Sequence, residues 1–224
     1  MSQTSRPLVL LVNPNSNAST TALMVDVART TLDPVGLEVR GVTAASGPAM
    51  IVGATDLERS AGEVLDAARR GLADDEGRVV AIVVAAFGDP GREALAAAVD
   101  VPVVGIGQSS LMAAAAGGRR FGMATTTPGL VGSLEAMVRR HDVAAGFAGI
   151  RLTRTGPTAL AERPELQDLE LEQAARACFE EDGAEAVIIA GGPLSGAARR
   201  IAASGIGTVV EPVPAAMRRV LDLR

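Results

Sequence analysis

The chain of 224 residues contains no lysine, no tryptophan and no tyrosine, and it has only one histidine and one cysteine. All 21 basic residues are therefore arginine. Without lysine, the chain has no anchor for pyridoxal phosphate and no Walker A loop. One cysteine excludes a disulfide framework and a cysteine-based metal cluster within the chain. A Ser-His-Asp triad would have to use His141, the single histidine. Chemistry is left to carboxylates, hydroxyls, amides, arginine and backbone N–H groups.

Charge and hydropathy narrow the class of protein further. The formal net charge is −5 and aromatic residues make up 2% of the chain, with no basic stripe, so no nucleic-acid surface is expected. No apolar run reaches the roughly 18 residues of a membrane span. Met1–Arg6 lacks the charged start and apolar core of a signal peptide. With 48% hydrophobic residues, we expect a cytoplasmic protein with a large buried core and no membrane partner.

Short β-branched runs alternate with alanine-rich stretches of helical periodicity. The pattern predicts strands over 8–12, 37–43, 79–84, 101–106, 121–125, 149–153, 186–190 and 208–210. It predicts helices over 19–32, 56–72, 91–99, 108–116, 129–140, 165–181, 195–203 and 214–223. Such alternation is typical of parallel sheets joined by right-handed helical crossovers, so it predicts an α/β fold.

The second half of the pattern resembles the first half. The apolar run that ends near Ala86 and the run that ends near Gly192 each lead through a Gly/Pro turn and a helix to another short strand. This repeat predicts two pseudo-symmetric lobes, each a roughly four-stranded parallel sheet flanked by helices. We assign 1–106 and 207–224 to the first lobe and 107–206 to the second. Ligands of open α/β sheets bind beyond the carboxyl ends of the strands, so we expect the active site in the interlobe cleft.

Four loops that follow strands and open helices are the candidate ligand-binding segments: 13–17, 85–91, 125–129 and 191–196. Backbone N–H groups are unpaired at such positions, and the helix dipole favours an anion there. Ordinary turn and capping chemistry is the alternative for each loop, since Asn, Ser, Thr, Gly and Pro are common in turns. The candidate substrate-binding residues are Asn13, Asn15, Ser16, Ala86, Phe87, Thr125, Thr126, Gly192 and Pro193.

Two carboxylates are the candidate catalytic residues. Asp89 either caps a helix or touches substrate, and Glu211 directly follows the last strand, where a buried acid facing a cleft often has a shifted pKa. Structural roles are favoured for His141, which ends a helix, and for Cys178, which lies among alanines on a helix. The 191–196 loop does not have the spacing of a dinucleotide-binding motif. We therefore expect no cofactor and no metal.

The loop motifs resemble those of the hydantoin and allantoin racemases, within the cofactor-independent aspartate/glutamate racemase superfamily. Asn13-Pro14-Asn15-Ser16 is similar to the opening of these proteins, and Ala86–Gly91 is similar to their central motif. The matching segments, in order, are 13–16, 86–91, 101–107, 120–127, 187–191 and 214–216. The resemblance spans the chain and implies two pseudo-symmetric α/β lobes around one active site.

The resemblance also implies a departure in mechanism. Racemases of this family use two cysteines, one from each lobe: one removes a proton from one face of the substrate carbon, and the other returns a proton to the opposite face. These positions fall on Ala86 and Gly192, and Cys178 lies on the wrong element to replace either. Any proton shuttle is then a carboxylate, with Asp89 and Glu211 the first candidates, or a water molecule.

The expected function is isomerase-type proton transfer at an activated carbon of a small carboxylate, ureide or cyclic imide, without the two-thiol mechanism. The substrate is expected to be anionic, and the chain is expected to form a homo-oligomer. Two alternatives stay open: a lyase of the decarboxylating or eliminating type on the same fold, and a catalytically inactive homologue that binds a ligand.

Overall fold

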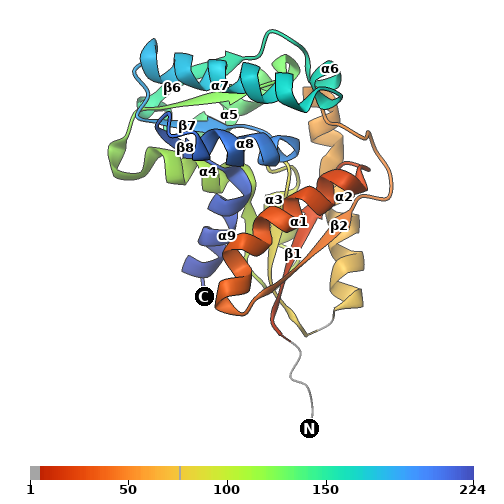
Figure 1. Ribbon diagram of the computed structural model, residues 1–224. Helices are drawn as coiled ribbons and strands as arrows, with labels where there is room; N and C mark the ends of the chain where they lie inside the picture. Colours follow the sequence, from red (N-terminus) through yellow and green to blue (C-terminus); the bar gives the residue numbers. More distant parts are fainter. Residues whose placement is uncertain (1–5, 76) are drawn as a thin grey trace.

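A computed structural model describes residues 6–75 and 77–224 and shows two lobes, one above the other in Figure 1. Most of Met1–Arg6, on which the expectation about targeting rests, lies outside the described residues. The strands are β1 (Leu8–Asn13), β2 (Glu38–Thr43), β3 (Val79–Val84), β4 (Val103–Gly105), β5 (Phe121–Thr125), β6 (Phe147–Leu152), β7 (Ala186–Ile189) and β8 (Thr208–Val210). The helices are α1 (Ala18–Leu32), α2 (Ala54–Asp74), α3 (Arg92–Ala96), α4 (Ile106–Ala115), α5 (Val131–Arg140), α6 (Pro157–Ala161), α7 (Pro164–Glu180), α8 (Ser195–Ala203) and α9 (Pro212–Asp222). Within the described ranges, no helix combines the length and the apolar character that crossing a membrane requires.

The two sheets have the same topology. The strand order is β2-β1-β3-β4 in the first lobe and β6-β5-β7-β8 in the second, and every pairing is parallel. In each sheet the first strand of the lobe lies between the second and the third strands, and the fourth strand lies at the edge beyond the third. The prediction of an α/β fold with two similar four-stranded parallel sheets is confirmed.

Alternation along β1 shows how each sheet is covered on both faces. Val9 and Leu11 belong to the core cluster that includes residues of α1 and α9, whereas Leu10 and Val12 pack with residues of α2. All four side chains are fully buried. A strand buried on both faces must be apolar along its whole length, as parallel strands usually are. This explains why the sequence shows a continuous apolar run here.

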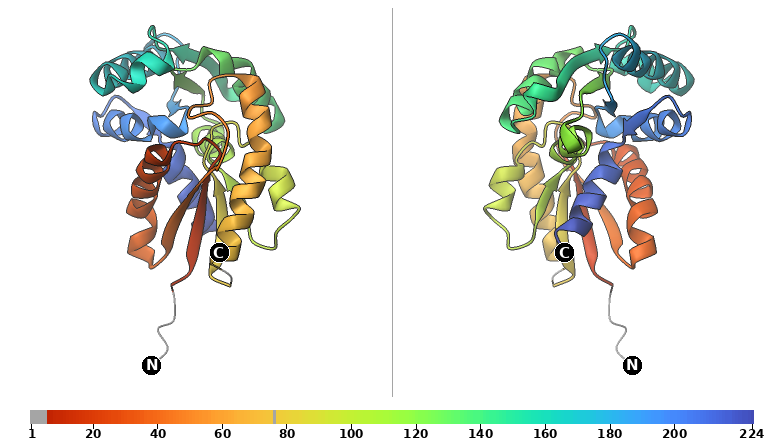
Figure 2. Two further views of the ribbon diagram at one scale, coloured as in Figure 1. Left: turned by 90° about the vertical axis from the view of Figure 1, so that its right-hand side faces the viewer. Right: turned by 90° about the vertical axis from the view of Figure 1, so that its left-hand side faces the viewer.

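Helix α9 connects the end of the second lobe to the first. It runs down beside the first sheet in both views of Figure 2, and it packs against α1 and α4. The division drawn from sequence assigns all of 207–224 to the first lobe, but β8 pairs with β7 in the second sheet. The repeat itself explains this difference, because β8 occupies the edge position that β4 occupies in the first sheet. Only the segment from Pro212 onward returns.

Most element boundaries agree with the sequence pattern to within two residues. The predicted helix over 91–99 ends at Ala96, and the predicted strand over 101–106 is only Val103–Gly105. Helix α4 begins at Ile106, directly after β4, rather than at Gln108. Helix α6 has no counterpart among the predicted elements, because its five residues are too few to show helical periodicity.

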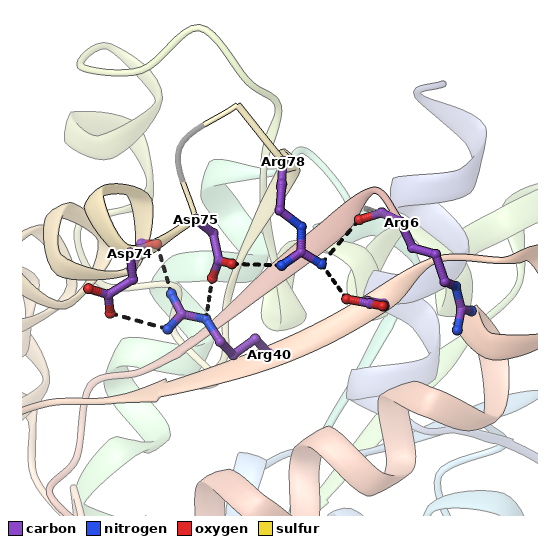
Figure 3. Close-up of polar contacts among 7 residues, drawn as sticks. Arg6, Arg40, Asp74, Asp75 and Arg78 are labelled. Atoms are coloured by element: carbon purple, nitrogen blue, oxygen red, sulfur yellow. Dashed lines mark hydrogen bonds and ion pairs between the residues drawn. The ribbon is translucent and has the colours of Figure 1, made fainter. Parts of the chain in front are cut away.

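An ion cluster ties the amino ends of the first sheet to the end of α2 (Figure 3). Arg40 on β2 pairs through Nε with Asp75 at 2.6 Å and through Nη1 with Asp74 at 3.2 Å. Arg78 pairs through Nη1 with Asp75 at 2.9 Å and also with Glu38. Glu38 begins β2, so this cluster lies at the edge of the sheet opposite to the carboxyl ends of the strands. We assign it to stability rather than to the site.

Candidate active site

A cavity of about 230 Å³ lies between the lobes, at the carboxyl ends of the strands. Loops that follow β1, β3, β5 and β7 all contribute to its lining. Met50 and Ile51, from the segment between β2 and α2, also line it, as do residues of α1, α2, α6 and α7. Pockets for drug-sized ligands are usually about 300–1,000 Å³. This cavity therefore fits a small molecule, and it lies where the strand-end rule predicts a ligand.

Asn13 holds the 13–17 loop in place through hydrogen bonds of its side chain. Its side chain is fully buried, and its Nδ2 donates to Oδ1 of Asn15 at 2.9 Å, to Oγ1 of Thr21 at 2.9 Å and to the carbonyl oxygen of Asn17 at 3.3 Å. Its Oδ1 accepts from the N–H of Asn15 at 3.2 Å. Asn13 does not line the cavity. Ser16, also predicted to contact substrate, is exposed and donates to the carbonyl oxygen of Gly47 at 3.1 Å.

Asn15 is the residue of this loop that combines burial with a place in the cavity lining. Its Oδ1 accepts from Nδ2 of Asn13 and from the N–H of Asn17, at 2.9 and 3.0 Å. These two bonds fix the orientation of the amide group. Its Nδ2 donates to no acceptor in the described part of the chain. The Asn15 amide is therefore pre-oriented and keeps a donor for a ligand.

The three threonines after β5 have different roles. Thr125 is buried, and its Oγ1 donates to the carbonyl oxygen of Ala190 at 2.8 Å, so it joins the ends of β5 and β7 and does not line the cavity. Thr126 and Thr127 line the cavity, and their hydroxyl oxygens lie 3.3 Å apart. Of the two threonines predicted to contact substrate, the structure places Thr126 in the cavity lining and Thr125 behind it.

Backbone N–H groups are the most numerous donors in the lining. Three loops, two of them in the second lobe, each contribute two consecutive residues whose N–H groups have no acceptor in the ranges 6–75 and 77–224. These residues are Ala86, Phe87, Thr126, Thr127, Gly191 and Gly192. An N–H group without an acceptor in the protein is available to water or to a ligand. Carbonyl oxygens and anions are the ligand groups that accept from such donors.

Strand pairing defines which residues of the two lobes correspond. Ala85 donates its N–H to the carbonyl oxygen of Val12 at 2.8 Å, and Ala190 donates in the same way to Ala124 at 2.9 Å. The residues that follow, Ala86 and Gly191, are therefore the symmetric pair. Gly192 is one position further along the chain than the counterpart of Ala86.

The space available for a side chain also favours Gly191 over Gly192 as the counterpart of Ala86. A Cβ on Gly192 would lie 2.8 Å from the carbonyl oxygen of Ala85 and 3.0 Å from the sulfur of Met24. A Cβ on Gly191 would meet only the side chain of Leu194, at 3.0 Å, and its φ of 165° is extended backbone that any residue adopts. Gly191 is thus the better counterpart of Ala86 for a side chain that acts in the cavity. Gly192 and Pro193, both predicted to bind substrate, line the cavity.

Asp89 lies next to the cavity-lining residues but is turned away from them. Its carboxylate accepts from the N–H of Gly107 at 2.8 Å and from the N–H of Gln108 at 2.6 Å, at the start of α4. Burial raises its pKa to about 6, against the lowering effect of these two bonds and of Arg92 and Arg140. Asp89 therefore caps α4 from a neighbouring loop and is not part of the lining of the interlobe cavity.

The remaining candidate side chains also lie outside the lining. Glu211 is half-buried at the start of α9, and burial raises its pKa, but it does not line the cavity. Cys178 is fully buried on α7, and its Sγ donates to the carbonyl oxygen of Met123 at 3.5 Å. Burial raises the pKa of this thiol to about 11. His141 ends α5.

The described residues that line the cavity include no Asp, Glu, His, Cys or Arg. Its polar side chains are amides and hydroxyls. Nine lining residues lie outside the four candidate loops: Thr20, Met50, Ile51, Leu57, Leu130, Pro157, Ala161, Gln167 and Ala190. They belong to no motif, so only the tertiary packing of their segments around the cavity reveals them.

The two lobes have equal strand orders, and a small cavity lies between them at the strand ends, so the chain is a two-lobed, pseudo-symmetric α/β protein. The sequence pattern of the Asp/Glu/Hydantoin racemase family matches residues 9–220, and the chain belongs to this family. The hydantoin racemase of Paenarthrobacter aurescens is 29% identical over 210 residues, which cover 94% of this chain and 88% of that protein.

Two solved structures of allantoin racemases have the same fold. The enzyme from Klebsiella pneumoniae superposes with a TM-score of 0.88 at 24% identity, covering 97% of this chain and 87% of the other. The enzyme from Pseudomonas fluorescens superposes with a TM-score of 0.87 at 27% identity, covering 96% and 90%. The resemblance inferred from the loop motifs is therefore confirmed for the family and the fold.

Proposed function

We propose that this chain is a racemase-type isomerase that binds a small cyclic ureide, such as a hydantoin, in the interlobe cavity. The observation that carries the proposal is the set of unpaired backbone N–H donors at 86–87, 126–127 and 191–192. A hydantoin or allantoin ring presents two carbonyl oxygens, one on the carbon next to the carbon acid and one across the ring, between the two nitrogens. Donors from both lobes match that arrangement, and the cavity of about 230 Å³ matches a small ring.

Stabilisation of an enolate is the chemistry that such donors support. When the C–H beside a carbonyl loses its proton, negative charge develops on the carbonyl oxygen, and pre-aligned N–H groups stabilise that charge by several kcal/mol. The amide of Asn15, already oriented by Asn13 and Asn17, would add one more donor. The site would thus make the carbon acid stronger without holding a formal positive charge.

Water is the proposed proton carrier. In this account a water molecule takes the proton from the ring carbon, and water returns a proton to either face of the planar enolate, which gives the mirror-image product. A positioned general base usually contributes about 10²- to 10⁴-fold in rate. We therefore expect turnover well below that of a racemase with two thiols.

A binding protein is the second candidate function, because the described lining holds no titratable side chain. Such a homologue would use the same N–H groups and the Asn15 amide to hold a ureide, with no proton transfer above the solvent rate. A lyase is the third reading, and it would need a carboxylate-bearing substrate such as a substituted malonate.

Proton NMR in D₂O separates these functions. The panel contains both enantiomers of 5-methylhydantoin, allantoin and a substituted malonate. Protein-dependent loss of the C5 proton signal together with loss of optical rotation is the result expected of an isomerase. Saturable binding by calorimetry without exchange would identify a binding protein and would overturn the isomerase proposal. Consumption of the malonate with release of carbon dioxide would identify a lyase.

A further inference from the structure

A second cavity, of about 500 Å³, adjoins the 86–91 loop. Ala86 and Phe87 line the interlobe cavity, whereas the next residues of the loop, from Gly88 to Arg92, line the second one. Leu57 on α2 lines both. The second cavity is bounded by α2 and α3 of the first lobe and by α5 of the second. It is therefore a second cavity between the lobes, and the 86–91 loop and the side chain of Leu57 border both cavities.

Cationic side chains from the two lobes meet in this cavity. Arg92 comes from α3, and Arg140 and His141 come from the end of α5. The Arg92 side chain is only 17% exposed, and its ion pair with the exposed Glu93 is long, at 3.4 Å. Arg140 forms no ion pair with any residue that the structure describes. Arg140 is exposed, so water screens its charge, whereas the Arg92 guanidinium is mostly buried and lacks a strong partner.

His141 lies close enough to Arg92 and Arg140 for both positive charges to act on its imidazole. Its pKa is lowered, first by burial and then by the positive charges of Arg92 and Arg140. The same two arginines also act on the buried carboxyl of Asp89. Like charges that approach one imidazole from two lobes repel each other, unless an anion lies between them.

The carboxylates around the cavity compensate these charges only in part. Asp89 is held by two N–H groups of α4, and Glu58 and Glu93 are exposed residues, where water screens their charge. Asp142, which follows His141, is exposed as well. Glu93 and Asp142 raise the pKa of His141, but they act more weakly on it than the two arginines do.

We propose that this second cavity binds a small dianion, of the phosphate or dicarboxylate type, between Arg92 of the first lobe and Arg140 of the second. A bidentate guanidinium contact from each side is the geometry that arginine provides for such groups. The bound anion would hold α3 against α5. Because the 86–91 loop lines both cavities, the anion would also stiffen the loop that carries Ala86 and Phe87.

The single histidine makes the test direct, because His141 gives the only imidazole signals in the proton NMR spectrum. The titration of His141 is recorded in sodium sulfate, in sodium succinate and in sodium chloride at equal ionic strength. An anion between the arginines cancels their effect, so we expect sulfate to raise the His141 pKa by about half a unit and in a saturable way. A response to sulfate alone assigns a phosphate-type ligand, and a response to succinate alone assigns a dicarboxylate.

Three variants control the test. Arg140→Gln and Arg92→Gln should each raise the His141 pKa without added anion and should abolish the response to sulfate or succinate. Arg139→Gln is the matched control, since Arg139 is exposed, as Arg140 is, but does not line the cavity; it should respond as the wild type does. Equal responses in sodium chloride, or an unchanged response in both Arg140→Gln and Arg92→Gln, would overturn the proposal.

Discussion

The N–H of Gly107 donates to Oδ1 of Asp89 at 2.8 Å, across eighteen positions of the chain. This bond and its neighbour from Gln108 connect the 86–91 loop to the first turn of α4. The loop carries Ala86 and Phe87 of the cavity, and α4 packs against both α9 and β7. Asp89 therefore links the cavity to the junction of the two lobes, although it does not line the cavity.

Asp89→Asn should change how stability depends on pH. Burial raises the pKa of Asp89 in the folded chain from 3.8 to about 6, so the folded state holds this proton more tightly than the unfolded state does. The stability it contributes is fully present below about pH 4 and is lost as pH rises through 6, by on the order of 3 kcal/mol. Urea unfolding of wild type and variant between pH 4 and 7 measures it. The wild type should lose stability relative to the variant over this range; a constant difference would contradict the assignment.

Asn15→Asp should separate ligand binding from folding. The aspartate keeps the oxygen that accepts from Asn13 and Asn17 but loses the Nδ2 donor and adds a negative charge. We expect at least about 10-fold weaker binding of 5-methylhydantoin by calorimetry, with unfolding free energy within about 1 kcal/mol of wild type. Asn13→Ala is the comparison, because it leaves buried partners unpaired and should cost about 2–3 kcal/mol of stability. Unchanged affinity in Asn15→Asp would remove Asn15 from the site.

Iodoacetamide should leave the folded chain unmodified and any activity intact. Cys178 is fully buried, and burial raises the pKa of its thiol to about 11, so the reactive thiolate is scarce at neutral pH. Mass spectrometry after treatment measures labelling, and the urea-unfolded chain serves as the positive control. Stoichiometric labelling of the native chain with parallel loss of turnover would show that the thiol takes part.

A pair of thiols introduced at the symmetric positions should accelerate proton exchange. Ala86→Cys with Gly191→Cys would add a thiol from each lobe to the lining of one cavity, and we expect proton exchange about 10²-fold or more faster than in the wild type. Each single change should give far less inversion. Ala86→Cys with Gly192→Cys is the matched control, since a Cβ at 192 would lie 2.8 Å from the carbonyl oxygen of Ala85; overpacking of this kind costs about 1–3 kcal/mol. Faster exchange in the 192 pair than in the 191 pair would refute the symmetric assignment.

Local patterns in the sequence were sufficient for most of the fold. The runs over 79–84, 121–125, 195–203 and 208–210 form elements with those bounds, because apolar periodicity and turn residues act locally. The start of α4 could not be predicted, since the carboxylate that caps it comes from a distant loop. The lobe that β8 joins depends on strand pairing, which local patterns do not encode.

The candidate site was predictable down to its loops but not to its side chains. The strand-end rule led to the segments that hold Asn15, Ala86 and Thr126, all of which line the cavity. It could not separate these from Asn13 and Thr125, whose side chains bond to neighbouring elements instead. Which neighbours satisfy a polar side chain is a property of tertiary packing.

The rate of C5 deuteration of 5-methylhydantoin in D₂O tests the central claim most directly. Free N–H groups on three loops should stabilise the enolate, so the wild-type chain should exchange the C5 proton faster than buffer alone, with saturation in substrate. Asn15→Asp should lower this rate, and loss of optical rotation should follow the same time course. Exchange at the buffer rate in the presence of saturable hydantoin binding would contradict the account and would leave a binding protein on a racemase fold.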